Sequence, residues 1–117
     1  MTMVQQASWI LTLHGCRDIE PALWVGGRDQ PQGDRIIKHL QDVGLPAQRC
    51  DRPGLRGLHP DNLCNRGRQA AGVQLEISLG LRHLLFTDLC QQRIRSRTPL
   101  FYQLVDTLAG CLPLSPA

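Results

Sequence analysis

His14 and Glu76 are the two residues of this chain whose types and settings suit hydrolytic chemistry. His14 belongs to the run His14-Gly15-Cys16, at the carboxyl end of an apolar segment that is expected to form a strand. Sites of open α/β sheets form at the carboxyl ends of strands, and a neutral imidazole there binds zinc or acts as a base. The alternative is a histidine that only caps the end of the strand.

Glu76 stands in the segment Val73-Gln-Leu-Glu-Ile-Ser78 and is one of only two glutamates in the chain. The alternation of side chains along a strand places it on the face opposite Leu75. A carboxylate in a core strand is costly unless it is paired, binds a metal or takes part in catalysis. Beside a metal-bound water, Glu76 would take up a proton and pass it to the leaving amine. The alternative is an edge strand with one solvated face.

Residues 51–72 are rich in Gly, Pro and Arg, and this segment is predicted to be a long, basic, irregular loop. Loops longer than about 12–15 residues in compact domains tend to be functional or disordered. Within it, Asn62-Leu-Cys-Asn65-Arg66 offers an arginine that can bind a carboxylate through two hydrogen bonds and an asparagine that adds directed ones. Asn65 and Arg66 are therefore candidate contacts for an acidic substrate. The alternative is turn chemistry beside a surface arginine.

Two further motifs carry weaker signals. Gly26-Gly27-Arg28-Asp29 matches neither of the common glycine-rich phosphate-binding patterns, so a strand-to-helix turn is the favoured interpretation. His59 and Cys64 are also potential metal ligands. Their spacing from the His14-Gly15-Cys16 run matches no standard zinc finger, so a metal site of that composition is disfavoured.

The elements that must position these residues follow from capping residues and from apolar periodicity. Strands are predicted at residues 8–14, 22–26, 47–50 and 73–78, and the first of them is expected to be buried on both faces. Helices are predicted from Asp29 to Gly44, after Ser78 with Leu81, Leu84, Leu85 and Leu89 on one face, and from Thr98 to near Gly110. This order of strands and helices predicts an α/β sheet with helices packed on it.

Length and composition limit the classes of protein that the chain can represent. It has 117 residues, enough for one domain, and no apolar run long enough for a transmembrane helix. The first residues lack the basic segment of a signal peptide, so a cytoplasmic location and no membrane partner are expected. The five cysteines have no Cys-x-x-Cys spacing and are expected to be mostly buried thiols. Because the net charge of +3 is concentrated in the middle of the chain, a non-catalytic module that binds an acidic polymer or nucleic acid through loop 51–72 is an alternative function.

Taken together, the motifs resemble those of one family, the phage-type poly-γ-glutamate hydrolases. The resemblance covers about residues 8–85, and the run from Gly72 to Arg82 is its most specific part. The matching segments, in the order of the family, are Leu13-His14-Gly15, Trp24-Val-Gly-Gly-Arg28, Asn62-Leu-Cys-Asn-Arg-Gly67 and Gly72-Val-Gln-Leu-Glu-Ile-Ser-Leu-Gly-Leu-Arg82. A generic small α/β domain is the remaining alternative.

The resemblance implies an α/β fold related to the zinc carboxypeptidases, in which a mixed sheet lies between helix layers. It also implies hydrolysis of γ-glutamyl amide bonds with zinc as the cofactor. By this resemblance, His14 is a zinc ligand and Glu76 is the catalytic general base. Asn65 and Arg66 would contact the carboxylates of the substrate, an acidic γ-glutamyl polymer or peptide.

One motif of the family is missing from this sequence. The His-Gly-Gly-x-Ile-Glu motif, which supplies the first two zinc ligands in the family, does not occur in residues 1–117. A catalytic zinc needs three protein ligands and an open position, and His14 is one ligand. We therefore expect residues 1–117 to be a single, incomplete domain with a partial mixed sheet, resembling the C-terminal half of the enzyme and inactive alone. The expected partners are a missing N-terminal half or, at the sheet edge that its absence would leave unpaired, a second copy of the chain.

Overall fold

The computed structural model of the chain describes residues 2–87 and 96–113. In chain order the elements are α1 (Met3–Gln6), β1 (Leu11–Cys16), β2 (Leu23–Gly26), α2 (Gln30–Asp42), β3 (Ala47–Arg49), the 3-10 helix η1 (Leu63–Asn65), β4 (Val73–Ser78), α3 (Leu79–Leu85), β5 (Phe86–Thr87), β6 (Ser96–Arg97) and α4 (Pro99–Cys111). None of the helices in these ranges is long and apolar enough to cross a membrane.

Strand β4 lies in the interior of a four-stranded sheet, whose order is β1-β4-β2-β3. It runs parallel to β1 and antiparallel to β2, and β2 runs parallel to β3. The predicted mixed α/β architecture is confirmed, and the predicted strand 73–78 coincides with β4. Because β4 has a neighbour on each side, ladder hydrogen bonds hold it firmly and its side chains are well positioned.

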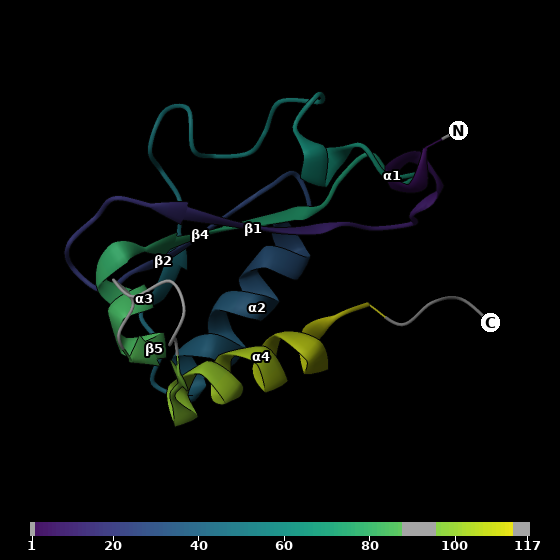
Figure 1. Cartoon of the computed structure of the whole chain (residues 1–117). Coiled ribbons are helices and arrows are strands. Elements are labelled where there is room, and N and C mark those ends of the chain that lie inside the picture. Colours follow the sequence, from purple (N-terminus) through teal and green to yellow (C-terminus); the bar gives the residue numbers. More distant parts are fainter. Residues whose placement is uncertain (1, 88–95, 114–117) are drawn as a thin grey trace.

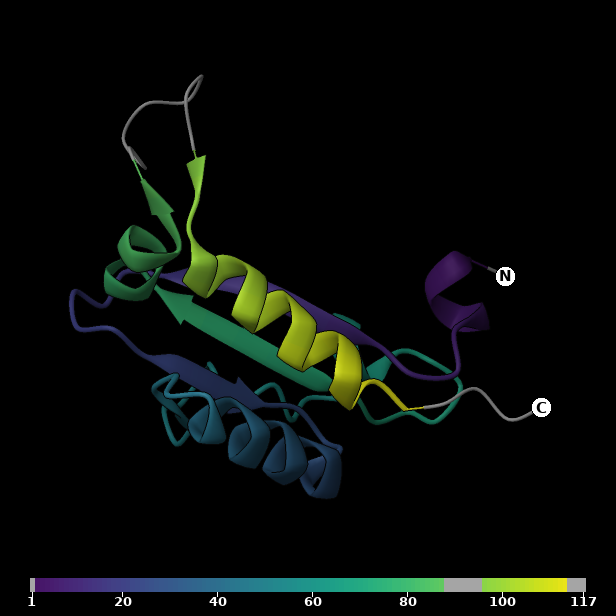
Figure 2. The same ribbon diagram turned by 90° about the horizontal axis from the view of Figure 1, so that it is seen from below.

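The two faces of the sheet are covered in different ways (Figure 1). Helices α2 and α4 pack against each other beneath one face, and loop 51–72 crosses the opposite face. In Figure 2, which is seen from below, α4 lies in front of the sheet and runs roughly along β4. Apolar side chains fill the space between the sheet and the helices, and they include Leu23, Val25, Ile36, Leu40, Val73, Leu75, Leu81 and Leu104. The polar side chains of the sheet are therefore left to the face under the loop.

Helix α2 begins and ends at the residues that the sequence predicts. The side chain of Asp29 accepts a hydrogen bond from the amide of Gln32 (3.2 Å), and Pro31 occupies the first turn. Gly44 has a φ of +85°, the left-handed conformation in which glycine ends a helix at no steric cost. The segment before Asp29 is thus a strand-to-helix turn, as predicted.

Ser78 and Thr98 each begin a helix and tie it to a neighbouring segment. The hydroxyl of Ser78 accepts hydrogen bonds from the amides of Leu81 (3.0 Å) and Ala22 (2.8 Å), so it caps α3 and joins it to the start of β2. The hydroxyl of Thr98 donates to the carbonyl of Leu85 (3.0 Å), the last residue of α3. The predicted helix starts at these two residues are confirmed.

Strand β1 differs from its prediction in position and in burial. The sequence predicts a strand over residues 8–14 with both faces buried, whereas β1 spans Leu11–Cys16 and forms an edge of the sheet. Leu13 is 56% exposed, and His14 and Gly15 are exposed as well. The prediction of two buried faces is wrong for the part of the chain described here, because β1 has one neighbouring strand and the helix layer does not cover Leu13.

Helix α3 is shorter than its apolar pattern predicts. It ends at Leu85, and the chain then forms a two-stranded sheet from Phe86–Thr87 and Ser96–Arg97. Leu84, predicted to pack on the same face, is 51% exposed, and Leu89 lies outside the described residues. Neither α1 nor the pair β5–β6 is predicted from the sequence, because elements of so few residues carry too little periodic pattern.

Most of the cysteines are buried thiols, as predicted. Cys50, Cys64 and Cys111 are buried, Cys16 is half-buried, and none of these four is in a disulfide; Cys90 lies outside the described residues. Burial raises the pKa of the Cys64 and Cys111 thiols, which keeps them protonated and unreactive. These cysteines therefore serve packing.

Candidate functional site

A row of side chains crosses the sheet on the face that loop 51–72 covers. Glu76 of β4 lies opposite His14 of β1 and opposite Trp24 of β2. Trp24 in turn lies opposite Gln48 of β3. Residues directly opposite in neighbouring strands share a face and touch or nearly touch. The row therefore brings together His14 and Glu76, both singled out from the sequence, and adds Trp24 beside them.

Glu76 is the buried carboxylate of this row, with 5% of its surface exposed. Its Oε1 accepts a hydrogen bond from Nε2 of Gln74 (3.2 Å) and lies 4.0 Å from Nδ1 of His14. Burial raises the pKa of Glu76 above its ordinary value, and the charge of His14 opposes that rise. The alternative of a solvated edge strand is excluded, because β4 is an interior strand. A buried carboxylate with a raised pKa is suited to accept a proton from water.

Gln74 connects Glu76 with loop 51–72. The same Nε2 atom that donates to Glu76 approaches the carbonyl oxygen of Leu55 in the loop at 3.4 Å. Gly57 packs against this side chain, where a Cβ atom would lie 3.3 Å from Cδ of Gln74. The position of the loop therefore sets the orientation of the amide that holds the carboxylate of Glu76.

His14 lies at the β1 end of the row and is exposed, with 49% of its side chain accessible. Arg82 of α3 supports the end of the strand that carries it, because its Nη2 donates to the carbonyl oxygen of Cys16 (2.8 Å). The guanidinium also lies against Gly15, where a Cβ atom would be 2.9 Å from Nη1. Gly15 and Arg82 thus hold the edge strand against α3, and the imidazole of His14 stays accessible at that edge.

Trp24 is held by a charged pair that the sequence analysis did not single out. Asp18 accepts a hydrogen bond from Nε1 of Trp24 (3.0 Å) and another from Nη1 of Arg52 (2.8 Å). The Arg52 guanidinium lies over the indole ring, with Cζ 4.7 Å from the ring centroid. The hydrogen bond from Arg52 lowers the pKa of Asp18, so this carboxylate stays ionised at neutral pH. Trp24 belongs to the Trp24-Val-Gly-Gly-Arg28 motif, so the sequence draws attention to it. No local pattern indicates its contact with Arg52.

Asn65 and Arg66, the predicted substrate contacts, lie in different surroundings. Asn65 is 3% exposed, and its Nδ2 donates to the carbonyl oxygens of Gly57 (2.6 Å) and His59 (3.0 Å) within the loop. Its Oδ1 accepts hydrogen bonds from two backbone amides of neighbouring segments. Arg66 is exposed. The side chain of Asn65 is therefore committed to the loop itself, and contact of either residue with a substrate stays a prediction.

No three His, Cys, Asp or Glu side chains within the described ranges lie close enough to hold a metal ion. His14 and Glu76 form a pair rather than a set of three. Nδ1 of His59 accepts a hydrogen bond from the amide of Asp61 (3.0 Å), and the thiol of Cys64 is buried in the loop. The residues described here therefore do not by themselves form a three-ligand zinc site.

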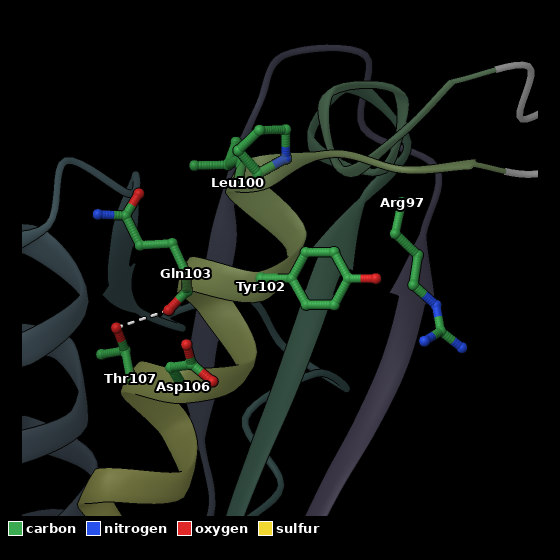
Figure 3. A pocket seen from close by; sticks show the side chains of 7 residues that line it. Arg97, Leu100, Tyr102, Gln103, Asp106 and Thr107 are labelled. Atoms are coloured by element: carbon green, nitrogen blue, oxygen red, sulfur yellow. Dashed lines mark hydrogen bonds between the residues drawn. The ribbon is translucent and has the colours of Figure 1, made fainter.

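A cavity of about 370 Å³ is lined by one end of the row and by the charged pair beside Trp24. Its lining includes Asp18, Glu20, Trp24, Gln48 and Arg52. A second cavity, of about 780 Å³, lies along α4 (Figure 3), and its lining includes Arg97, Leu100, Tyr102, Gln103, Asp106 and Thr107. Because no residue of the row lines this second cavity, it is not part of the candidate site.

Comparisons with known proteins agree with the resemblance found in the sequence. A model of the poly-gamma-glutamate hydrolase family matches residues 1–107. Two UPF0714 proteins of Bacillus subtilis, YmaC and YndL, are 28% and 26% identical to this chain over 111 residues each. The matches cover 93% and 92% of this chain but 47% and 44% of the two relatives, so the chain spans about half the length of the curated relatives it matches.

Two solved structures share the fold. A structure of a bacteriophage poly-gamma-glutamate hydrolase aligns with a TM-score of 0.85 and 24% identity, over 93% of this chain and 54% of the other. A zinc-free apo form of YndL aligns with a TM-score of 0.77 and 26% identity, over 88% of this chain and 52% of the other. These alignments confirm the fold that the resemblance implied.

Proposed function

The chain belongs to the poly-gamma-glutamate hydrolase family, and from that premise we propose that it supplies Glu76 and His14 to a site that hydrolyses γ-glutamyl amide bonds. The observation that carries the proposal is the buried carboxylate of Glu76, 4.0 Å from an imidazole, on the interior strand of the sheet. The arrangement favours an amide hydrolase over a binding module, because a binding module has no need of a buried carboxylate with a raised pKa.

In this proposal Glu76 is the general base. Its raised pKa brings the proton affinity of the carboxylate closer to neutral pH, where a base is most effective. Gln74 holds one carboxylate oxygen, and the other oxygen has no hydrogen-bond partner among the described residues. Glu76 would take a proton from the attacking water and deliver it to the nitrogen of the leaving amine. Each amide bond broken then yields one carboxylate and one amine.

Zinc dependence is proposed only for an assembly in which other ligands join His14. The part of the chain that the structure describes holds no group of three ligands, so it does not fit zinc on its own. His14 lies on β1, an edge strand of the sheet, and polypeptide alongside that edge would stand next to its imidazole. We place the remaining ligands there, on a missing N-terminal half or on another chain, and we expect the present chain alone to be inactive.

For the substrate we propose an acidic γ-glutamyl polymer or peptide. Arg66 is exposed, which leaves its guanidinium accessible to a carboxylate of the substrate. Asn65 would act on the substrate through the loop that it holds, because its amide is occupied by loop carbonyls. Both assignments rest on the resemblance and on the positive charge of the loop.

A chimera tests the proposal. The part of the bacteriophage enzyme that aligns with this chain is replaced by this chain, and release of free amines from poly-γ-glutamate is measured with and without zinc, beside the chain alone. We expect turnover that depends on zinc in the chimera and none from the chain alone. Glu76→Gln in the chimera should lower kcat about 100- to 10,000-fold while the zinc content stays the same.

Two results would contradict the proposal. Stoichiometric zinc and robust turnover in the chain alone would show that it needs no further ligands from another segment or chain. Unchanged kcat in a folded, zinc-loaded Glu76→Gln chimera would remove Glu76 as the base. His83→Gln is the matched control, because His83 is exposed on α3 away from the row and should leave kcat unchanged.

A further inference from the structure

Arg52 is fixed over the ring of Trp24 in a way that leaves part of its guanidinium unused. Its Nη1 is 2.8 Å from each carboxylate oxygen of Asp18, so this one nitrogen carries the whole contact. Nε and Nη2 of Arg52 make no hydrogen bond among the residues that the structure describes. An arginine side chain presents those two nitrogens as a fork that matches the two oxygens of a carboxylate. Arg52 therefore keeps one complete fork for a ligand.

The surroundings hold this fork in place without covering it. Asp18 also accepts the indole hydrogen bond of Trp24, so the ring and the guanidinium share one anchor. Stacking on the ring restricts the guanidinium further, and a pre-ordered group loses less entropy when a ligand binds. Arg52 nevertheless keeps 41% of its side chain exposed and lines the cavity of about 370 Å³ beside the row.

The fork lies one side chain away from the buried carboxylate of the row. Trp24 separates the two, since it lies under Arg52 and directly opposite Glu76 in the neighbouring strand. A γ-linked glutamyl chain carries a free α-carboxylate on every residue, a few bonds from each amide. A carboxylate held at Arg52 would therefore bring a neighbouring amide of the same chain towards Glu76.

We propose that Arg52, stacked on Trp24 and anchored by Asp18, is a carboxylate-binding residue that positions a γ-glutamyl chain along the row. This inference rests on the proposed function, because it names a contact of that same site. Arg52 is a binding residue, whereas Asp18 and Trp24 are positioning residues that act through it. Glu20 lines the same cavity, and its negative charge opposes a second carboxylate there.

Binding of γ-glutamylglutamate to the chain itself tests the proposal without any turnover. The indole N–H resonances of Trp24 and Trp9 are followed in a ¹⁵N NMR titration at low salt, with Trp24→Phe to assign them. We expect the Trp24 signal to shift and the Trp9 signal to stay, because Trp9 donates to Asp29 instead of lying beside Arg52. Arg52→Gln should weaken binding at least tenfold, a fold-change that corresponds to about 1.4 kcal/mol.

Matched variants separate this contact from general charge effects. Arg68→Gln removes the same charge from the same loop, at an exposed residue that does not line the cavity, and it should weaken binding less than Arg52→Gln. Arg52→Lys keeps the charge but loses the fork, so it should also bind more weakly than wild type. Glu20→Gln removes the opposing charge and should bind more tightly. Preserved dispersion of the spectrum shows that each variant is folded.

The proposal is overturned if wild type shows no binding, if Arg52→Gln binds as tightly as wild type, or if Arg68→Gln weakens binding as much as Arg52→Gln does. None of these results bears on Glu76 as the base, which the chimera tests by turnover. Conversely, loss of binding in Arg52→Gln supports the contact even if the Glu76→Gln chimera keeps its kcat. The two proposals therefore fail in different measurements.

Discussion

Replacing Asn65 by alanine tests whether this residue clamps loop 51–72 or serves only as a substrate contact. The side chain joins four backbone groups of separate segments, namely the carbonyls of Gly57 and His59 and the amides of Arg28 and Gly72. Asn65 itself is buried, so solvent water does not have access to replace the hydrogen bonds of its amide. Asn65→Ala would release all four groups at once and loosen the loop that covers Gln74 and Glu76.

The cost follows from the surroundings of the four groups. A typical hydrogen bond contributes about 0.5–1.5 kcal/mol, and a buried group left without a partner costs about 1–3 kcal/mol. Gly57 and Gly72 are buried, whereas His59 and Arg28 are exposed and can turn to water. We therefore expect Asn65→Ala to lower the free energy of unfolding by about 2–5 kcal/mol, and the Tm by roughly 8–20 °C in a domain of this size.

Urea and thermal unfolding, followed by circular dichroism, measure this loss. Asn62→Ala is the matched control, because Asn62 lies in the same turn and its side chain does not cap η1. It should change stability by less than about 0.5 kcal/mol. A loss below about 1 kcal/mol for Asn65→Ala, or equal losses for the two variants, would refute the clamp. If Asn65 only contacted the substrate, its replacement by alanine would weaken substrate binding and leave the free energy of unfolding unchanged.

Two further predictions concern packing and pH. Gly72→Ala should lower the free energy of unfolding by about 1–3 kcal/mol or more, because a Cβ there meets the backbone oxygens of Cys64 and Ile10. Gly110→Ala should raise it by about 0.5–1 kcal/mol, because Gly110 lies in α4 with open space around it. Thermal unfolding in which both variants changed stability in the same direction would contradict this prediction. Burial raises the pKa of Glu76, so the folded state holds that proton more tightly than the unfolded state, and the resulting stability is present at low pH and lost as pH rises through the folded pKa. Wild type should therefore lose stability relative to Glu76→Gln as the pH rises from the ordinary pKa of a glutamate through the raised pKa of Glu76, and a difference in unfolding free energy that stayed constant with pH in urea unfolding would contradict this reasoning.

The sequence predicted correctly those features that depend on residues close together in the chain. Asp29, Ser78 and Thr98 each begin a helix at the predicted residue, because a capping side chain bonds amides only two or three positions away. The alternation in Val73–Ser78 likewise placed Glu76 on the face opposite Leu75. Capping and alternation depend on neighbours in the chain, so the sequence carries them in full.

Contacts between segments that are distant in the chain were not predicted from the sequence. The burial expected for residues 8–14 failed because exposure of Leu13 depends on which strand lies next to β1. Asn65 and Arg66 share one motif, yet one is enclosed by carbonyls of its own loop and the other is exposed. The anchoring of Trp24 by Asp18 and Arg52 joins three segments, and no spacing rule predicts it.

The sequence by itself determined the family and the class of fold, because motif order, capping and alternation depend only on the order of residues along the chain. It also singled out His14 and Glu76 as candidates for hydrolytic chemistry. Only the tertiary structure decided that His14 sits exposed on an edge while Glu76 is buried beside it, 4.0 Å away. It also decided that Arg52 lies over Trp24 with a free fork. Burial and strand order arise from packing between segments that are far apart in sequence, and those properties set proton affinity and access to ligands.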